Sequence, residues 1–251
     1  MITTTTILLL ITSFAAGFID SISGGGGLLL LPALLISGLP PQTAIGTNKF
    51  TATLGLSSSL LNFIVNKKID WQVVRQGILP SLAGSLLGAK LLLLFSNETV
   101  GKIILVLLPL AIAATLWPHK QAERAESVQV SRIKVPAVCL VIGFYDGFFG
   151  PGSGSILLLA LYLFIGLDLV KASATTKAFS FLTCLTSVVV FFSNGIVLLS
   201  LGLLLAAANI AGNFLGSKLV MQKGTKIVKA CLAVSLAILF ASLSAKYLMN
   251  K

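Results

Sequence analysis

Charged side chains are scarce in this chain of 251 residues. Only 10% of the residues are Asp, Glu, Lys or Arg, whereas 56% are hydrophobic, and the mean hydropathy is +1.02. No soluble domain could bury so much apolar surface. A bilayer core takes roughly 20 apolar residues per helix, and the chain offers about eight such lengths with short polar connections. We therefore expect an all-α integral membrane protein, with residues 1–251 forming a single transmembrane domain.

Residues that carry catalysis or bind metals are equally few. The single histidine, His119, has no Cys or carboxylate at ligand spacing, and the three cysteines lie far apart in apolar segments, where ordinary packing is the expected role. The stretch from Gly152 to Ser155 lacks the G-x-S-x-G spacing of a nucleophile elbow, and no phosphate-binding G-x-x-x-x-G-K-S/T loop occurs. We therefore expect no enzymatic activity, no metal and no cofactor.

Acidic residues are the scarcer sign of charge, since 7 Asp and Glu stand against 18 Lys and Arg, for a formal net charge of +11. In a soluble protein this excess would suggest a nucleic-acid partner. Here the cations lie mainly at the ends of apolar segments, where they set topology, so we expect the lipid bilayer as a partner and no nucleic acid. Three short loops that can face the cytoplasm together carry most of them: Lys67, Lys68 and Arg75; Lys120, Arg124, Arg132 and Lys134; Lys218, Lys223, Lys226 and Lys229. If these three loops face the cytoplasm, both termini of the chain lie outside.

Against this apolar background, a motif of an aspartate followed by a glycine cluster occurs twice. The stretch GFIDSISGGGG at 17–27 returns as GFYDGFFGPGS at 143–153. Further along, residues 84–90 match residues 212–218 at an offset of 128, and the same offset relates the polar stretches around Lys49 and Lys177. A constant offset through Gly, Asn and Lys positions indicates an internal duplication.

The duplication divides the chain into repeat 1 over residues 1–117, a cytoplasmic linker over 118–134 and repeat 2 over 135–251. The first two segments of each half are short, so we expect broken or re-entrant helix pairs that line a cavity. With the cationic loops on one side, the two repeats have inverted topology, a plan typical of secondary transporters. Apolar runs and glycine breaks predict about eight to ten helical segments, at 7–20, 26–38, 41–66, 71–95 and 99–117, then at 134–148, 152–166, 168–193, 197–220 and 226–247.

The two aspartates of the motif are costly in a membrane. An ionised Asp near the bilayer centre costs roughly 2.5 to 3.5 kcal/mol on insertion scales, so Asp20 and Asp146 should not face lipid. Two roles are open for them. Each carboxylate either caps the second short helix and holds the break together, or takes part in proton or substrate handling.

The glycine clusters predict an anion site. Glycines permit tight backbone turns and expose amide groups at the start of a short helix, whose positive end attracts anions. Two such helix ends, entering from opposite sides, could share one anion. Close helix packing through small residues is the alternative, and it explains Gly84 with Gly88 and Gly212 with Gly216. The candidate anion-binding residues of the clusters are Gly24, Gly25, Gly26 and Gly27, with Gly150, Gly152 and Ser153 in the second copy.

Two lysines at matching positions complete the candidate site. Lys supplies a compact positive charge, and neighbouring hydroxyl and amide groups supply directional hydrogen bonds, which suits an oxyanion. Snorkelling of both lysines to the headgroups is the competing account. The residues concerned are Thr47, Asn48 and Lys49 in the first half, and Thr175, Thr176 and Lys177 in the second.

These residues carry a resemblance. The duplicated pattern G-F-x-D with a glycine cluster, followed by T-N-K at 47–49 or T-T-K at 175–177 before a long helix, resembles the TauE/SafE family of sulfite and organosulfonate exporters. The similarity covers essentially the whole chain. It implies transport of small sulfur-containing anions such as sulfite or organosulfonates, usually outward across a bacterial cytoplasmic (inner) membrane. The second copy departs from the glycine-rich pattern at Pro151, Ser153 and Thr176.

Three functions remain open. The favoured one is secondary transport of a small anion by alternating access between the repeats, with proton coupling through Asp20 or Asp146 left undecided. The runner-up is a cation carrier that uses these two aspartates, and the third is a membrane scaffold or sensor without flux. The small-residue patterns are compatible with packing within one chain and with a homo-oligomer.

Overall fold

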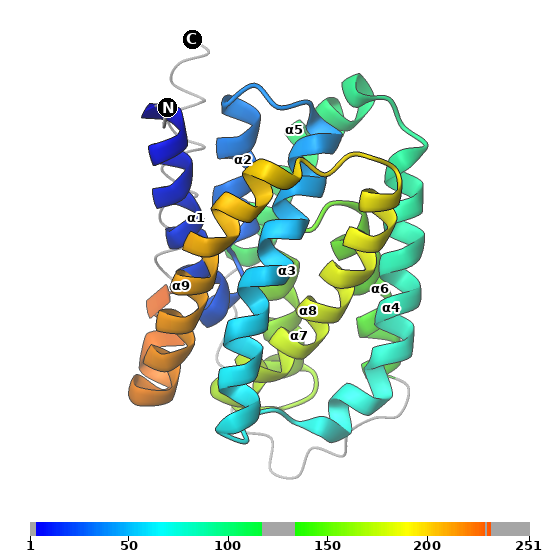
Figure 1. The fold of residues 1–251 in the computed structure, drawn as a ribbon. Coiled ribbons are helices and arrows are strands. Elements are labelled where there is room, and N and C mark those ends of the chain that lie inside the picture. The colour runs from blue at the N-terminus through cyan, green and yellow to red at the C-terminus, as the bar shows by residue number, and fades with distance from the viewer. Residues whose placement is uncertain (1–3, 117–133, 229, 232–251) are drawn as a thin grey trace.

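The computed structural model describes residues 4–116, 134–228, 230 and 231, and this part of the chain folds into helices without strands (Figure 1). The all-α membrane fold is thereby confirmed. Residues 225–228, 230 and 231 are also helical, whereas the rest of the segment predicted at 226–247 and nearly all of the linker lie outside the described residues. The labelled helices are α1 Thr4–Ser23, α2 Gly27–Ile36, α3 Pro41–Val65, α4 Trp71–Leu93, α5 Asn97–Leu116, α6 Lys134–Phe148, α7 Ser153–Leu163, α8 Leu169–Ser193 and α9 Leu199–Lys223.

Local sequence signals explain where the long helices begin. Asp70 caps α4 by accepting hydrogen bonds from the backbone N–H groups of Gln72 and Val73, and Asp168 caps α8 in the same way. Helix α1 runs through Asp20 to Ser23, further than expected. Ser23 is tolerated at that end because its hydroxyl bonds back to the carbonyl of Ile19 within the helix.

Helix length separates spanning segments from partial ones. Helices α1, α4, α8 and α9 are long and apolar enough to cross a membrane. By contrast α2 has 10 residues and α7 has 11, which gives about 15 Å each, half of a bilayer core of roughly 30 Å. Each leading pair therefore joins a longer helix to one that reaches only about half way.

Each leading helix packs on a long helix of the other half. Helix α1 lies against α9, and α6 lies against α4. Glycines make this approach possible: a methyl group on Gly88 would lie 2.2 Å from the carbonyl oxygen of Phe144, and one on Gly216 would lie 2.5 Å from that of Phe18. Gly84 and Gly212 approach α6 and α1 in the same manner. The packing role predicted for these four glycines is confirmed.

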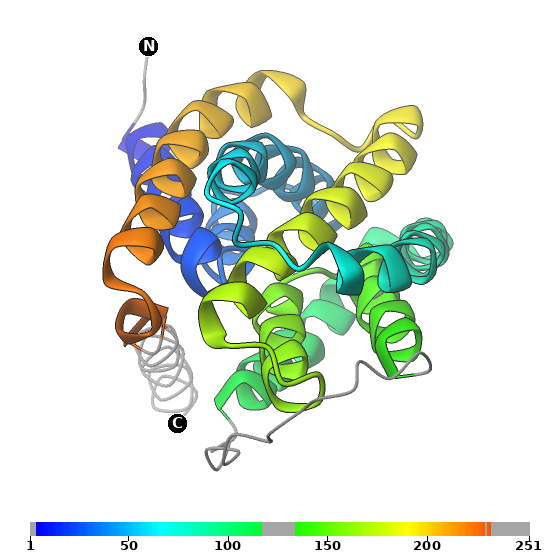
Figure 2. The same cartoon turned by 90° about the horizontal axis from the view of Figure 1, so that it is seen from below.

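The two halves are also joined by a matched pair of hydrogen bonds. The hydroxyl of Thr47 accepts from the backbone N–H of Leu198 at 3.0 Å, and the hydroxyl of Thr175 accepts from that of Asp70 at 3.0 Å. Both donors and both acceptors are related by the sequence offset of 128 residues. Helices α3 and α8, which carry these threonines, lie side by side within the bundle (Figure 2).

Two apolar clusters close the two ends of the bundle. One gathers the α3–α4 connection and the starts of α6 and α8, and it includes Ile69, Val135 and Leu169. The other gathers the ends of α2 and α8 and includes Leu34 and Phe191. Figure 1 shows the α3–α4 connection and the α8–α9 connection at opposite ends of the protein. The buried polar side chains of the motifs lie between these clusters.

We predict that Gly88→Ala loosens the contact between α4 and α6. Because the added methyl group would meet the backbone of Phe144, the helices must separate, at a cost of about 1 to 3 kcal/mol. The measurement is thermal unfolding of the purified protein in detergent. The control is Leu87→Ala, a change at the neighbouring residue, whose side chain is 58% exposed. Equal melting temperatures for the two variants would contradict the packing role.

Candidate functional site

The two glycine clusters meet in the middle of the protein. Gly24 and Gly150 have φ of +83° and +94°, a left-handed conformation that favours glycine. A methyl group on Gly24 would lie 2.3 Å from the carbonyl carbon of Gly154, and one on Gly154 would lie 2.8 Å from the Cα of Gly24. The break after α1 and the break before α7 are therefore in backbone contact, which requires glycine on both sides.

A buried ion pair joins the halves beside this contact. The Nζ of Lys49 on α3 lies 2.8 Å from the Oδ1 of Asp146 at the end of α6, and the two side chains are 2% and 7% exposed. The hydroxyl of Ser153, the first residue of α7, donates to the same carboxylate oxygen. Burial excludes snorkelling for Lys49. The sequence predicted both charges for the site, but not that a lysine of one half pairs with the aspartate of the other.

Cys184 on α8 completes the surroundings of the pair. Lys49 Nζ donates to Cys184 Sγ at 3.7 Å, and Cys184 Sγ donates to Asp146 Oδ2 at 3.9 Å. Nothing in the spacing of the cysteines signalled this position. A helical count would have found it, because Cys184 lies seven residues after Lys177, about two turns further along the same face of α8.

The matching residues of the other half are arranged differently. Lys177 is completely buried and donates to the backbone carbonyl of Asp20, at the end of α1. The Asp20 carboxylate accepts from the backbone N–H of Gly26 at 3.3 Å, across the break. Asp20 thus holds its own break together, as the capping role predicts, whereas Asp146 both bonds the start of α7 and neutralises a lysine. Lys177 does not snorkel either.

A cavity of about 30 Å³ lies between the two breaks. This volume holds about two water molecules. The predicted residues that line it are Asp20, Gly24, Gly27, Asn48, Lys49, Asp146, Gly150 and Ser153. The walls also contain Ser180 and Cys184, which the sequence did not single out, and Gly154.

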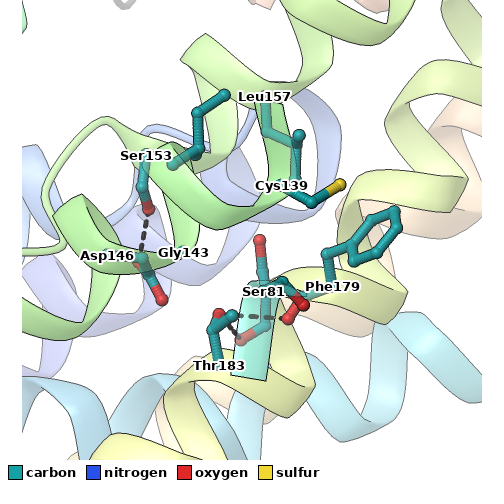
Figure 3. Close-up of a pocket in the computed structure, with 10 residues that line it drawn as sticks. Ser81, Cys139, Gly143, Asp146, Ser153, Leu157, Phe179 and Thr183 are labelled. Carbon is teal, nitrogen blue, oxygen red and sulfur yellow. Dashed lines mark hydrogen bonds between the residues drawn. The ribbon is translucent and has the colours of Figure 1, made fainter. Parts of the chain in front are cut away.

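The remaining predicted residues do not line this cavity. Thr47 and Thr175 point to the helix starts to which they are hydrogen-bonded. The backbone N–H of Gly26 donates to the Asp20 carboxylate. Thr176 is fully buried and its hydroxyl oxygen has no hydrogen-bond partner. Gly25, Gly152 and Lys177 also lie outside the lining. A second cavity, of about 10 Å³, shares Asp146, Ser153 and Ser180 with the first. Figure 3 shows Asp146 and Ser153 at this second cavity.

The arrangement allows one exchange of partners. The Lys49 ammonium is the charge that would attract an anion, but the Asp146 carboxylate already occupies it. An anion entering the main cavity therefore competes with that carboxylate, unless a proton neutralises Asp146. Asn48 and the glycine backbone supply further hydrogen-bonding groups around the cavity.

The comparison with protein families decides the family. The sequence profile described as "Sulfite exporter TauE/SafE" matches residues 9–243, nearly the whole chain. The chain belongs to the TauE/SafE family. This TauE/SafE protein is therefore a membrane transporter and not an enzyme, as the motifs predicted.

Curated relatives of the TauE/SafE chain carry transporter names as well. A "Probable membrane transporter protein" of Haemophilus influenzae is 35% identical over 205 residues, covering 81% of this chain and 80% of the relative. "Probable membrane transporter protein ORF9" of Sinorhizobium sp is 37% identical, covering 81% and 78%. "Probable membrane transporter protein YfcA" of Escherichia coli K12 is 32% identical, covering 84% and 79%. No solved structure matches.

We predict that Asp146→Ala is far more destabilising than Asp20→Ala. The first change leaves the buried Lys49 ammonium without its carboxylate, at a cost of about 3 to 5 kcal/mol, whereas Asp20 forms no ion pair with any residue that the structure describes. Thermal unfolding in detergent measures both. Combining Asp146→Ala with Lys49→Met removes both charges and should recover most of the stability that Asp146→Ala alone loses. If Asp20→Ala proved as harmful, or the double variant recovered nothing, the ion pair would not be the stabilising contact.

Proposed function

We propose that this protein is a secondary transporter of small sulfur-containing anions such as sulfite or organosulfonates, and that it exports them across the bacterial cytoplasmic membrane. The family supports transport and its description supports the substrate class. The observation that carries the proposal is the buried Lys49 ammonium, which lines the cavity between the two breaks together with Asn48 and four glycines. Such a group, surrounded by hydrogen-bond donors, suits an oxyanion.

Alternating access between two inverted repeats is the proposed mechanism. Three sets of contacts at matching positions support it: α1 on α9 with α6 on α4, the threonine bonds at Thr47 and Thr175, and the mutual contact of the two breaks. Because the main cavity lies where the halves meet, a rocking motion of one half on the other would open it to one side at a time.

The proposed orientation places the cationic loops in the cytoplasm and both termini outside. In Figure 1 the α3–α4 connection, which carries Lys67 and Lys68, lies at the same end as Lys223 at the end of α9. The start of α1 and the α8–α9 connection, which lacks Lys and Arg, lie at the other end. This distribution agrees with the positive-inside rule.

The ion pair favours an anion over a cation as the substrate. A cation carrier would need both Asp20 and Asp146 available to the cation, but Lys49 already neutralises Asp146, and Lys177 approaches the backbone of Asp20. A cation in the main cavity would be repelled by the Lys49 ammonium that lines it, whereas an anion is attracted to this group.

We predict that Lys49→Ala abolishes sulfite flux into liposomes that contain the purified protein. Removal of the buried ammonium should lower the rate by about tenfold or more, since a charged hydrogen bond contributes roughly 1.5 to 3 kcal/mol. Lys90→Ala, which removes an exposed lysine at the end of α4, is the control and should transport normally. The double variant Lys49→Met with Asp146→Asn carries no buried charge, so it should fold and still not transport.

Other outcomes of the same assay select other functions. Sulfite and sulfonate flux that survives Lys49→Ala would reject the anion site. Flux of a divalent cation that is lost in Asp20→Asn would support the cation carrier. Absence of flux for every small solute would support a scaffold or sensor.

A further inference from the structure

The smaller of the two cavities lies against Asp146, on the side away from Lys49. It has a volume of about 10 Å³ and is lined by the hydroxyl-bearing residues Ser81, Ser180 and Thr183. Figure 3 shows Ser81 and Thr183 across this space from Asp146. The volume is close to the minimum for one water molecule, which also needs two to four polar partners. The polar groups that line this side cavity supply that number of hydrogen-bond partners.

The hydroxyl groups are oriented so that they can accept from a water molecule. Thr183 donates its proton to the carbonyl of Phe179 at 3.0 Å, and Ser81 donates to that of Ile78 at 2.9 Å. Each hydroxyl oxygen therefore keeps acceptor capacity toward the cavity. A water molecule there could bond a hydroxyl oxygen and the Asp146 carboxylate together.

The matching positions in the other half carry different side chains. Ser81 corresponds to Asn209 and Thr183 corresponds to Gly55, both by the offset of 128 residues. The amide of Asn209 donates to the Ser13 carbonyl at 2.8 Å, and a methyl group on Gly55 would lie 1.9 Å from the Asn209 Oδ1. The Asn209 side chain thus occupies the space that the Thr183 side chain takes at the matching position. The two hydroxyl groups of Ser81 and Thr183 therefore have no counterpart at Asn209 and Gly55.

Asp146 lies between the two cavities, and both are lined by it, Ser153 and Ser180. Cys139 and Phe179, each 1% exposed, also line the smaller cavity. From a water molecule in the side cavity, a proton can pass to Asp146 without crossing the main cavity. Several groups that titrate or carry charge surround the Asp146 carboxylate: Lys49 on α3, Cys184 on α8, Cys139 and Tyr145 on α6, and Asp20 on α1 across the main cavity. The other polar neighbours, Ser81 of α4 and Ser153 of α7, are neutral hydroxyls.

We propose that the side cavity holds a water molecule that delivers a proton to Asp146, and that protonation of Asp146 releases Lys49 to bind the transported anion. This inference rests on the proposed anion transport. A proton from the solution passes through this water, which accepts one proton as it gives another to a carboxylate oxygen of Asp146, so that no hydroxide is left behind. Lys49 stays an ammonium, and the anion replaces the carboxylate as its partner. Proton and anion then strengthen each other's binding, so that they cross together in the direction that their gradients set, which is outward when sulfite is concentrated in the cytoplasm.

Two changes at one residue test the water site. Ser81→Asn places a larger amide side chain in the side cavity, whereas Ser81→Ala leaves the cavity open and removes one hydroxyl partner of the water. In liposomes with an acidic exterior, the wild type should accumulate sulfite and Ser81→Ala should retain part of this accumulation. Ser81→Asn should lose about tenfold or more of this accumulation, because its proton transfer is blocked, and should retain downhill exchange of sulfite. Accumulation by Ser81→Asn at the wild-type level would overturn the proposal and leave anion transport standing.

Infrared difference spectroscopy of the purified protein tests protonation without any flux. Among the bands that the seven Asp and Glu carboxyl groups give on acidification, one should persist in Asp20→Asn and disappear in Asp146→Asn. Hydrogen–deuterium exchange of this band should be slower in Ser81→Asn than in Ser81→Ala. Identical carboxyl bands in the wild type and Asp146→Asn would refute the proton site. If the bands behave as expected and the wild type moves no sulfite, the proton site stands and the anion assignment fails.

Discussion

The ion pair between Lys49 and Asp146 is the constraint on which the site depends. Lys49 is 2% exposed, and the carboxylate that pairs with its buried ammonium comes from the other half of the chain. The pair fixes α3 against the end of α6, and through Ser153 it also fixes the start of α7. The glycine contact between the breaks makes this distance attainable. The ion pair and the glycine contact therefore both hold the two halves together around a single cavity.

The two halves share their packing and differ in their chemistry. Glycine contacts between helices and threonine bonds to helix starts recur at matching positions. The polar centre does not follow this rule, because Lys49 meets a carboxylate where Lys177 meets a backbone carbonyl. In the second copy Ser153 stands where the first has Gly27, and it gives Asp146 a hydroxyl donor. Ser81 and Thr183, where the other half has Asn209 and Gly55, line the cavity next to Asp146. Because the two copies differ at a few positions, the two aspartates have different contacts: Asp20 bonds across its own break, whereas Asp146 pairs with Lys49.

Much of this could be predicted from the sequence. Hydropathy and glycine breaks located the helices to within a few residues, since helix length and turn chemistry are local properties. The duplicated motif also predicted the main cavity's aspartates, glycines and first lysine. Thr47 was misplaced because residues two apart on a helix point to nearly opposite faces, so a neighbour of Lys49 in sequence faces away from it. The pairing of Lys49 with Asp146, and the part played by Cys184, depend on how the halves pack, which no local pattern encodes.

Competition between Asp146 and an anion for Lys49 is the central claim. Calorimetric titration of sulfite into purified wild type and Asp146→Asn tests it most directly, because the amide keeps the shape of the carboxylate and removes its charge. At neutral pH the variant should bind sulfite about tenfold or more tightly, since Lys49 no longer has an ionised partner. Weaker or unchanged binding in Asp146→Asn would show that the carboxylate does not hold Lys49 away from the anion, and would contradict the account.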